Sequence, residues 1–230
     1  MVEKNEAYCA AKLKENPLFR SIDDVSSSDL ILDASLKTWP KKTCFIDSHV
    51  THHKFHILIS GRLKVYYFDD TKDRKITLYL LTKHDVFDIY NLFHLSSHKV
   101  YYETLDTTEV LSIPIDKLKH WMHKNPSFYM GLLQYMIIKM KFLEEFVASS
   151  NLDDTSTKLA RLLLNYTNET SKKIELINDL SHKELAQLIG TTRAVLNRNI
   201  QKFKEDGILN ISNRQIEIKN MELLMDKIRD

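Results

Sequence analysis

Residues 180–207 constrain the fold more than any other stretch of the chain, because their pattern predicts two short helices joined by a tight turn. Ser181 is a typical N-cap residue, and Glu184, three positions later, completes a capping-box pattern. Gly190 follows the last apolar residue of the first helix, where a left-handed backbone conformation is common. Either of the two threonines that come next can cap the second helix.

The second of these helices is basic. The segment Arg193–Lys204 carries four cationic side chains and no acidic one. Its apolar residues Leu196, Ile200 and Phe203 recur at helical spacing, which predicts one buried face. A short helix, a glycine-containing turn and a basic second helix are typical of a helix-turn-helix that reads the major groove of DNA. The net charge of the whole chain is only +2, so the case for nucleic acid rests on this local charge.

The composition excludes several other classes of protein. The 230 residues suffice for one large domain or two small ones, and no apolar run is long enough to span a bilayer. The first residues lack the apolar core of a secretory signal, so we expect a cytoplasmic protein without a membrane partner. Only four glycines occur, and neither a P-loop nor a dinucleotide fingerprint is present. Cys9 and Cys44 cannot supply the four thiolates of a zinc or iron–sulfur site. We expect two reduced thiols, and a redox-sensing disulfide between them is the alternative.

The first half of the chain changes its periodicity once. Residues 5–37 are predicted to form two helices, with a break near Pro17. From residue 43 to residue 115 the apolar residues alternate with polar ones, which favours several short strands in an antiparallel sandwich or barrel. Asp116 is then expected to cap a short helix. The clearest alternation is at Leu63, Val65 and Tyr67.

A long amphipathic helix is predicted next. Its apolar residues follow each other in steps of four and three, which is a heptad pattern. Such a seam can pack on its own domain or against a second copy of the chain. The basic helix favours the second copy, because helix-turn-helix proteins commonly bind two half-sites as dimers. The seam residues are Tyr129, Leu133, Met136, Met140, Leu143 and Val147.

Residues 149–157 are polar and predict a hinge before the last part of the chain. After Gly207, the run ILNISNRQIEI predicts a hairpin with a polar tip, and a final helix follows. A hairpin beside a two-helix motif is a wing. The chain is therefore expected to be an α+β protein with a β-domain, a seam helix, a hinge and a winged helix-turn-helix.

This order resembles the CRP/FNR superfamily of bacterial transcription regulators across nearly the whole chain. The resemblance lies in ISGRLKVYY (59–67), KHDVFDIYNLF (83–93) and, most specifically, LSHKELAQLIGTTRAVLNRNIQKFKEDGIL (180–209). It implies a cyclic-nucleotide-binding-like antiparallel β-roll (a double-stranded β-helix) as sensor domain at 1–125, a dimerisation helix at 126–150 and a DNA-binding winged helix-turn-helix at 151–230.

The same resemblance implies a homodimer that binds a palindromic operator on double-stranded DNA, acts through RNA polymerase and is not an enzyme. Arg193 and Arg198 match arginines that family members use on phosphates or base edges, and arginine suits guanine O6 and N7 by geometry. Asn197 lies one turn from Arg193 and could read adenine or join a phosphate-side network. Ala194 replaces a glutamate that reads cytosine in many members, so we expect a half-site other than TGTGA or TTGAT. The expected phosphate contacts are His182, Thr191, Thr192 and Lys202.

The effector pocket departs further from the family. Cyclic-nucleotide binders of the family use a Gly-Glu pair on the ribose and an Arg-Ser pair on the phosphate. The matching positions here are Asp88-Ile89 and Lys99-Val100. Ile89 cannot accept from a ribose hydroxyl, and Asp88 would repel a phosphate, so we expect no cyclic-nucleotide binding. The effector is then an unknown small molecule or none.

Histidine is abundant, with ten residues and a cluster in HVTHHKFH. Imidazole suits both metal and haem, so these side chains could hold either. The cluster has no carboxylate partner and no regular spacing, so we predict no metal site and no cofactor, and haem through one histidine stays open. A cupin-like metal- or small-molecule-binding protein, whose last helices make protein contacts, is the alternative function. The histidines concerned are His49, His52, His53, His56, His94 and His98.

Overall fold

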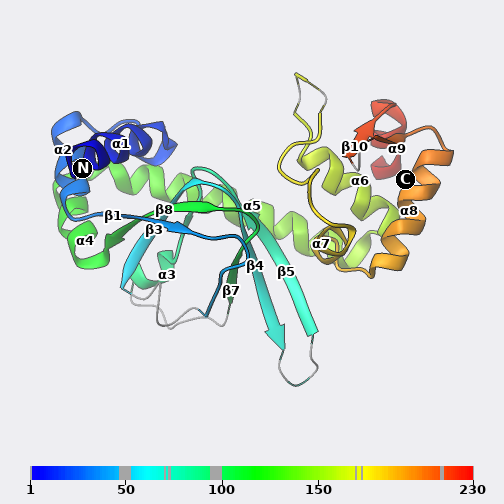
Figure 1. The fold of residues 1–230 in the computed structure, drawn as a ribbon, viewed down its shortest axis with the longest axis horizontal. Helices are drawn as coiled ribbons and strands as arrows, with labels where there is room; N and C mark the ends of the chain where they lie inside the picture. Colours follow the sequence, from blue (N-terminus) through cyan, green and yellow to red (C-terminus); the bar gives the residue numbers. More distant parts are fainter. Residues whose placement is uncertain are drawn as a thin grey trace. The chain divides into compact units, whose positions relative to one another are not determined.

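The structure is a computed structural model that describes residues 2–46, 53–69, 71, 74–93, 100–168, 170–171, 173–212 and 215–229 (Figure 1). The chain divides into two compact units, residues 1–141 and 142–230. One helix, α5 (Ser127–Leu152), belongs to both units. No helix among the described residues is long and apolar enough to cross a membrane.

The first unit is built around two four-stranded antiparallel sheets, as the alternating pattern predicted (Figure 1). One sheet has the order β1-β8-β3-β6 and the other β2-β7-β4-β5. Apolar side chains from both sheets, including Leu58, Val65 and Tyr102, share one buried cluster. The strands are β1 (Ser35–Trp39), β2 (Cys44–Ile46), β3 (Lys54–Ser60), β4 (Leu63–Asp69), β5 (Arg74–Leu81), β6 (Val86–Phe87), β7 (Tyr101–Thr104) and β8 (Thr108–Pro114).

Helices surround one end of this β-roll in Figure 1, and a second apolar cluster joins them to it. Phe19, Trp121 and Phe128 form its aromatic centre, with ring centroids 4.9 to 6.0 Å apart. The Trp121 indole N–H donates to the Ser26 carbonyl over 2.6 Å. This bond ties α4 to α2. The helices are α1 (Val2–Glu15), the 3₁₀ turn η1 (Pro17–Phe19), α2 (Asp24–Leu32), α3 (Ile89–Leu92), α4 (Ile115–Lys124) and the first part of α5.

Three local predictions in this unit were wrong. Helix α2 ends at Leu32, and residues 35–37 belong to β1 because they pair with β8. Asp116 does not cap α4. That helix begins at Ile115 after Pro114, which makes no side-chain cap bond, and Asp116 lies in its first turn.

The alternation in β4 is the third error. Leu63 and Val65 are buried, but Tyr67 is 43% exposed and Tyr66 is only 7% exposed. The register between β4 and β5 shifts between Val65 and Tyr66. The extra residue at this shift is Leu78 of β5, whereas β4 keeps an unbroken register with β7 from Leu63 to Tyr66. Tyr66 stacks on Tyr101 of β7, and Tyr67 lies beyond the part of β4 that pairs with β7.

Gly61 connects β3 to β4 with φ of +84°, and it leaves no room for a side chain. A Cβ there would lie 2.6 Å from Thr108 Oγ1 and 2.8 Å from the Thr107 carbonyl oxygen. Gly61→Ala adds backbone strain to this overlap, so we expect a loss of about 2–4 kcal/mol of unfolding free energy. Denaturant unfolding followed by tryptophan fluorescence measures it, because Trp39 and Trp121 both lie in this unit.

Gly131→Ala is the matched control for that measurement. Gly131 lies within α5, and a Cβ there would meet nothing nearer than the Leu18 carbonyl at 3.4 Å. We expect this variant to unfold within about 1 kcal/mol of the wild type, since alanine is the better helix former. Equal losses in the two variants would contradict the steric argument at Gly61.

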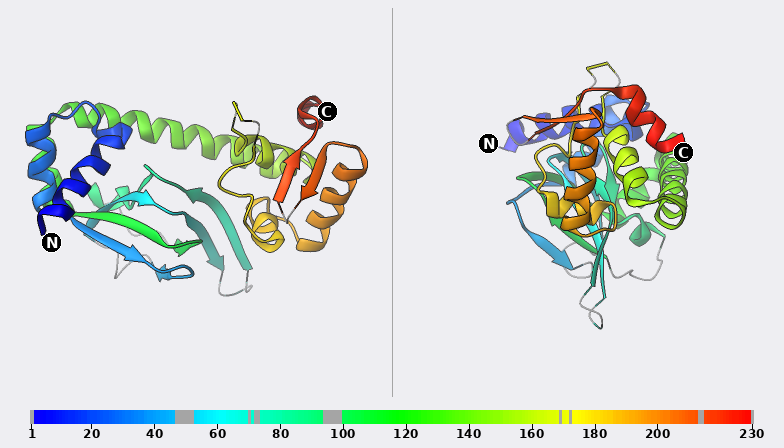
Figure 2. Two further views of the ribbon diagram at one scale, coloured as in Figure 1. Left: turned by 45° about the horizontal axis from the view of Figure 1, so that its top comes forward. Right: turned by 90° about the vertical axis from the view of Figure 1, so that its right-hand side faces the viewer.

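In its described residues, the second unit contains the end of α5, four further helices and a two-stranded antiparallel hairpin (Figure 2). The predicted hinge at 149–157 was too long. Helix α5 continues to Leu152, and Asp154 caps the next helix by accepting from the Thr157 N–H over 2.7 Å. The elements after α5 are α6 (Thr155–Asn165), α7 (His182–Leu188), α8 (Arg193–Glu205), β9 (Leu209–Ser212), β10 (Gln215–Ile218) and α9 (Met221–Arg229).

Candidate nucleic-acid interface

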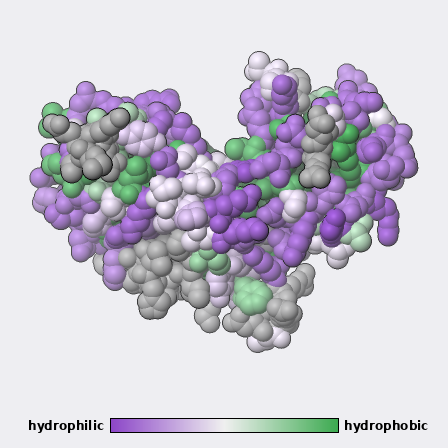
Figure 3. Space-filling view, in the orientation of Figure 1, coloured by the Kyte–Doolittle hydropathy of each residue, from purple (hydrophilic) through white to green (hydrophobic). Residues whose placement is uncertain are grey.

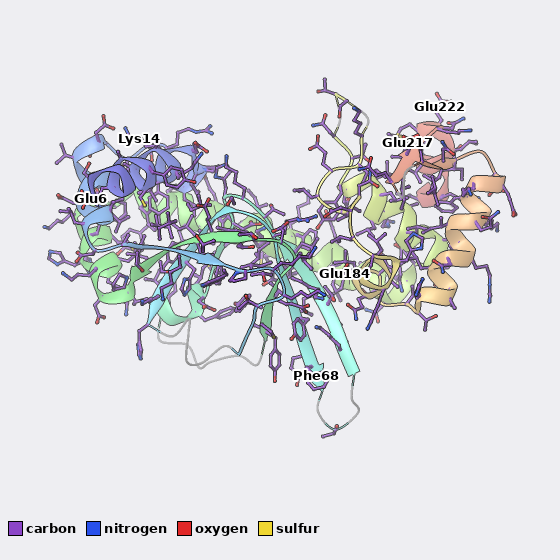
Figure 4. The ribbon with its side chains drawn as sticks, viewed as in Figure 1. Glu6, Lys14, Phe68, Glu184, Glu217 and Glu222 are labelled. Carbon is purple, nitrogen blue, oxygen red and sulfur yellow. The ribbon has the colours of Figure 1, made fainter. Side chains whose placement is uncertain are left out.

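The predicted capping box at the start of α7 is confirmed. The Glu184 N–H donates to Ser181 Oγ over 3.3 Å, and the Ser181 N–H donates to Glu184 Oε2 over 2.9 Å. Figure 4 labels Glu184 on this helix. Gly190 has φ of +67°, as predicted, and the chain turns there into the second helix.

Thr192, rather than Thr191, is the cap of α8. Its Oγ1 accepts from the Val195 N–H over 3.3 Å, while the Thr191 N–H donates to the Ala186 carbonyl over 2.9 Å. The predicted apolar face of α8 is buried, with Leu196, Ile200 and Phe203 at most 2% exposed. Thus one side of α8 packs inward and the other is free to meet a partner.

The outward side of α8 is polar and basic. Arg193, Asn197, Arg198 and Lys202 are all exposed, and hydrophilic residues cover most of the surface of α8 visible in Figure 3. Thr192 is exposed as well, whereas His182 and Thr191 are half-buried. The residues predicted to contact DNA therefore lie on α7, on α8 and in the turn between them.

Two side chains on this surface touch each other. His182 Nδ1, on the first residue of α7, lies 2.6 Å from Asn197 Oδ1 on α8. Sequence spacing alone gave no sign of this pair, because fifteen positions separate the residues. By contrast, Asn199 makes a bond within its own helix: its Nδ2 donates to the Val195 carbonyl over 3.0 Å.

The wing is present as β9 and β10, and Figure 2 shows it beside α8. The expected polar tip includes residues 213 and 214, which lie outside the described residues. Asn178, which the sequence analysis missed, supports β10. Its Oδ1 accepts from the Ile216 N–H over 2.7 Å, and its Nδ2 donates to the Ile216 carbonyl over 3.2 Å. One side chain thus pairs with β10 as a neighbouring strand would.

We expect Asn178→Ala to loosen the wing, because the part-buried Ile216 backbone groups lose both partners at a cost of about 1–3 kcal/mol. Hydrogen exchange at the Ile216 amide is the measurement, and the variant should exchange faster there. Asn178→Asp keeps the acceptor and should retain most of the protection. Unchanged exchange in Asn178→Ala would show that β9 alone holds β10.

The predicted heptad seam is exposed on α5. The exposed fractions run from 39% at Tyr129 and Leu143 to 57% at Val147. A different face of the same helix packs into the β-roll unit through Phe128 and Leu132, which are at most 2% exposed. A run of exposed apolar side chains over most of a long helix is typical of an interaction surface.

The residues that match the family's effector pocket are largely enclosed. Asp88 follows β6 with φ of +60° and is 2% exposed. The Tyr102 hydroxyl donates to Asp88 Oδ1 over 2.9 Å, and His56 Nε2 lies 3.9 Å from Oδ2. The Asp88 carboxylate is thus engaged by side chains of its own domain.

The other members of that pocket offer little to a cyclic nucleotide. Ile89 is a half-buried member of the apolar cluster, and Val100 is buried without a hydroxyl to donate. Lys99 lies outside the described residues. The side chains of Ile89 and Val100 supply neither an acceptor for a ribose hydroxyl nor a donor for a cyclic phosphate.

Of the six histidines singled out in the sequence, His53 and His56 lie in the described part of the chain. His49, His52, His94 and His98 lie outside the described residues. His53 is exposed in a turn, whereas His56 is buried in β3 and its Nδ1 lies 2.9 Å from Ser112 Oγ. Within the described ranges, no group of three or more His, Cys, Asp or Glu side chains comes together to hold a metal.

Neither cysteine is in a disulfide. Cys9 is buried in α1, and burial raises the pKa of its thiol. Cys44 is exposed in β2, and its Sγ lies 2.9 Å from the Tyr66 hydroxyl.

A capped two-helix motif with an outward basic helix, a wing and a preceding β-roll defines a DNA-binding protein of the winged helix-turn-helix class. Residues 157–227 match the family described as "Crp-like helix-turn-helix domain". The chain thus carries a Crp-like helix-turn-helix domain, and it is similar over most of its length to transcription regulators of the CRP/FNR type.

Comparisons with individual proteins agree with this assignment. The chain is 23% identical to "Probable transcriptional regulator flp" of Lacticaseibacillus casei, over 91% of this chain and 94% of that protein. It is 21% identical to the "CRP-like cAMP-activated global transcriptional regulator" of Mycobacterium tuberculosis, over 76% of this chain and 80% of that protein. The fold matches a protein of Eubacterium rectale assigned to the CRP/FNR family, with a TM-score of 0.71, 20% identity and coverage of 93% and 98%.

Proposed function

We propose that the protein binds a palindromic operator as a homodimer, with α8 of each subunit in the major groove. The observation that carries this proposal is the exposed face of α8, which presents two arginines and an asparagine while the opposite face is buried. Arg193 and Arg198 would read base edges or phosphates, and Asn197 would read a base. Thr191, Thr192 and Lys202 would fix the register on the phosphates.

The exposed seam of α5 supports the dimer. Two copies of α5 packed along this seam would bury the apolar side chains of both. The two-fold axis of such a dimer would match an operator whose two half-sites lie about one helical turn apart. Under this proposal residues 126–150 are the dimerisation helix, residues 1–125 the sensor domain and residues 151–230 the DNA-binding domain.

The proposal also includes where the protein works and what controls it. The protein would work in the cytoplasm, beside RNA polymerase, and would not act as an enzyme. Because Asp88, Ile89 and Val100 do not fit a cyclic nucleotide, the dimer would respond to another small molecule or bind DNA without one.

Capture of genomic DNA by the purified, ligand-free protein tests the proposal. At near-physiological salt we expect enrichment of a palindrome whose half-sites lie about one helical turn apart. Binding to that palindrome should weaken steeply as salt rises, because contacted phosphates release counterions. If neither the protein alone nor the protein with cell-extract small molecules enriches a sequence, the proposed function is wrong.

A further inference from the structure

The contact between His182 and Asn197 joins two polar side chains of the proposed DNA surface. Its atoms are His182 Nδ1 and Asn197 Oδ1, at 2.6 Å. An amide oxygen only accepts hydrogen bonds, so the hydrogen must be on Nδ1 and His182 must be the donor. The bond runs from the first residue of α7 to the middle of α8, and therefore crosses the helix-turn-helix.

This bond sets the orientation of the Asn197 side-chain amide. A free asparagine amide can turn over and exchange its oxygen and nitrogen ends. With Oδ1 held beside α7, the amide is fixed in one orientation, and Nδ2 with its two N–H donors is the end left for another partner. Donors that enter the major groove require an acceptor on the base, and N7 supplies one on both purines.

We propose that His182 is a positioning residue that acts through Asn197, and that this pair selects a purine at one position of each half-site. The inference rests on the proposed function, because it places α8 in the major groove. It differs from a phosphate contact by His182, since the selectivity of the complex would depend on a bond within the protein.

A double-mutant cycle tests the pair. The operator recovered from genomic DNA is randomised one position at a time, and binding is measured for the wild type, His182→Ala, Asn197→Ala and the double variant. We expect one position per half-site at which the wild type prefers a purine by about five- to tenfold, the range of one or two net hydrogen bonds. Each single variant should lose that preference, and the double variant should lose no more.

Two conservative variants separate the two possible roles of the imidazole. Asparagine places its Nδ2 near the site of His182 Nδ1, so His182→Asn keeps the donor for Asn197 and should restore the purine preference. Glutamine places its donor nearer the site of Nε2, so His182→Gln would serve a phosphate but not Asn197. His123→Ala, which removes an exposed histidine of α4 in the other unit, controls for general effects.

The outcomes are distinct. If His182→Ala weakens all sequences equally and lowers the salt dependence, His182 is a phosphate contact and the inference is overturned. Better rescue by His182→Gln than by His182→Asn overturns it too, as does an unchanged preference in Asn197→Ala. Failure of the proposed function looks different, because the wild type would then enrich no palindrome at all.

Discussion

Arg198→Ala is expected to abolish specific operator binding while the protein stays folded. Arg198 is exposed on α8, on the side opposite the buried Leu196 and Phe203, so its removal leaves the packing of the helix intact. A bidentate arginine–guanine contact is worth about 1–3 kcal/mol, and a dimer makes two, so the loss should be about 2–6 kcal/mol. That corresponds to a fall in operator affinity of at least about thirtyfold.

Competition binding measures this effect, with the operator and a scrambled duplex at one salt concentration. Arg198→Lys is the matched variant, because lysine keeps the charge but lacks the fork that contacts two guanine atoms. We expect Arg198→Lys to bind scrambled DNA like the wild type and to lose most of its preference for the operator. Normal operator binding by Arg198→Ala would show that α8 is not the reading helix.

Met140→Glu is expected to separate the dimer and, with it, to remove operator binding. Met140 is 56% exposed in the single chain and lies at the centre of the seam. In a dimer its two copies would face each other near the two-fold axis, where two carboxylates would lose water and repel each other. A cost of several kcal/mol per buried ion predicts a rise in the dimer dissociation constant of at least about a hundredfold.

Ile138→Glu controls for the introduced charge. Ile138 lies on the same helix and is 66% exposed, but it is not a seam residue. Analytical ultracentrifugation should show Met140→Glu as a monomer and Ile138→Glu as a dimer at the same concentration. A dimeric Met140→Glu would refute the seam, whereas two monomeric variants would point to a wider interface on α5.

The spacing of apolar residues predicted the elements that have one buried face. The buried side of α8, the capping box of α7 and the wing all follow from short-range patterns, and the structure confirms them. The failures came where tertiary pairing overrides local pattern. Residues 35–37 look helical but pair with β8, and Tyr66 is buried where it stacks on Tyr101 of β7.

Side-chain pairs across elements were beyond prediction. Asn178 lies thirty-eight positions from Ile216, and His182 lies fifteen from Asn197, so no periodic pattern connects them. Asp88 matches the family's effector pocket by position, and its carboxylate meets Tyr102 and His56 within the β-roll. These contacts depend on how the strands and helices pack against each other, and local patterns in a single sequence do not predict that packing.

A dimer held together by the exposed stripe on α5 would also link gene control to protein abundance. If its apolar side chains are covered only when two copies meet, then below the dissociation constant the number of dimers grows with the square of the chain concentration. Halving the amount of protein would then lower operator occupancy by up to about fourfold. The cell could thus turn a modest change in synthesis or degradation of this regulator into a sharper change in transcription, without any signalling molecule.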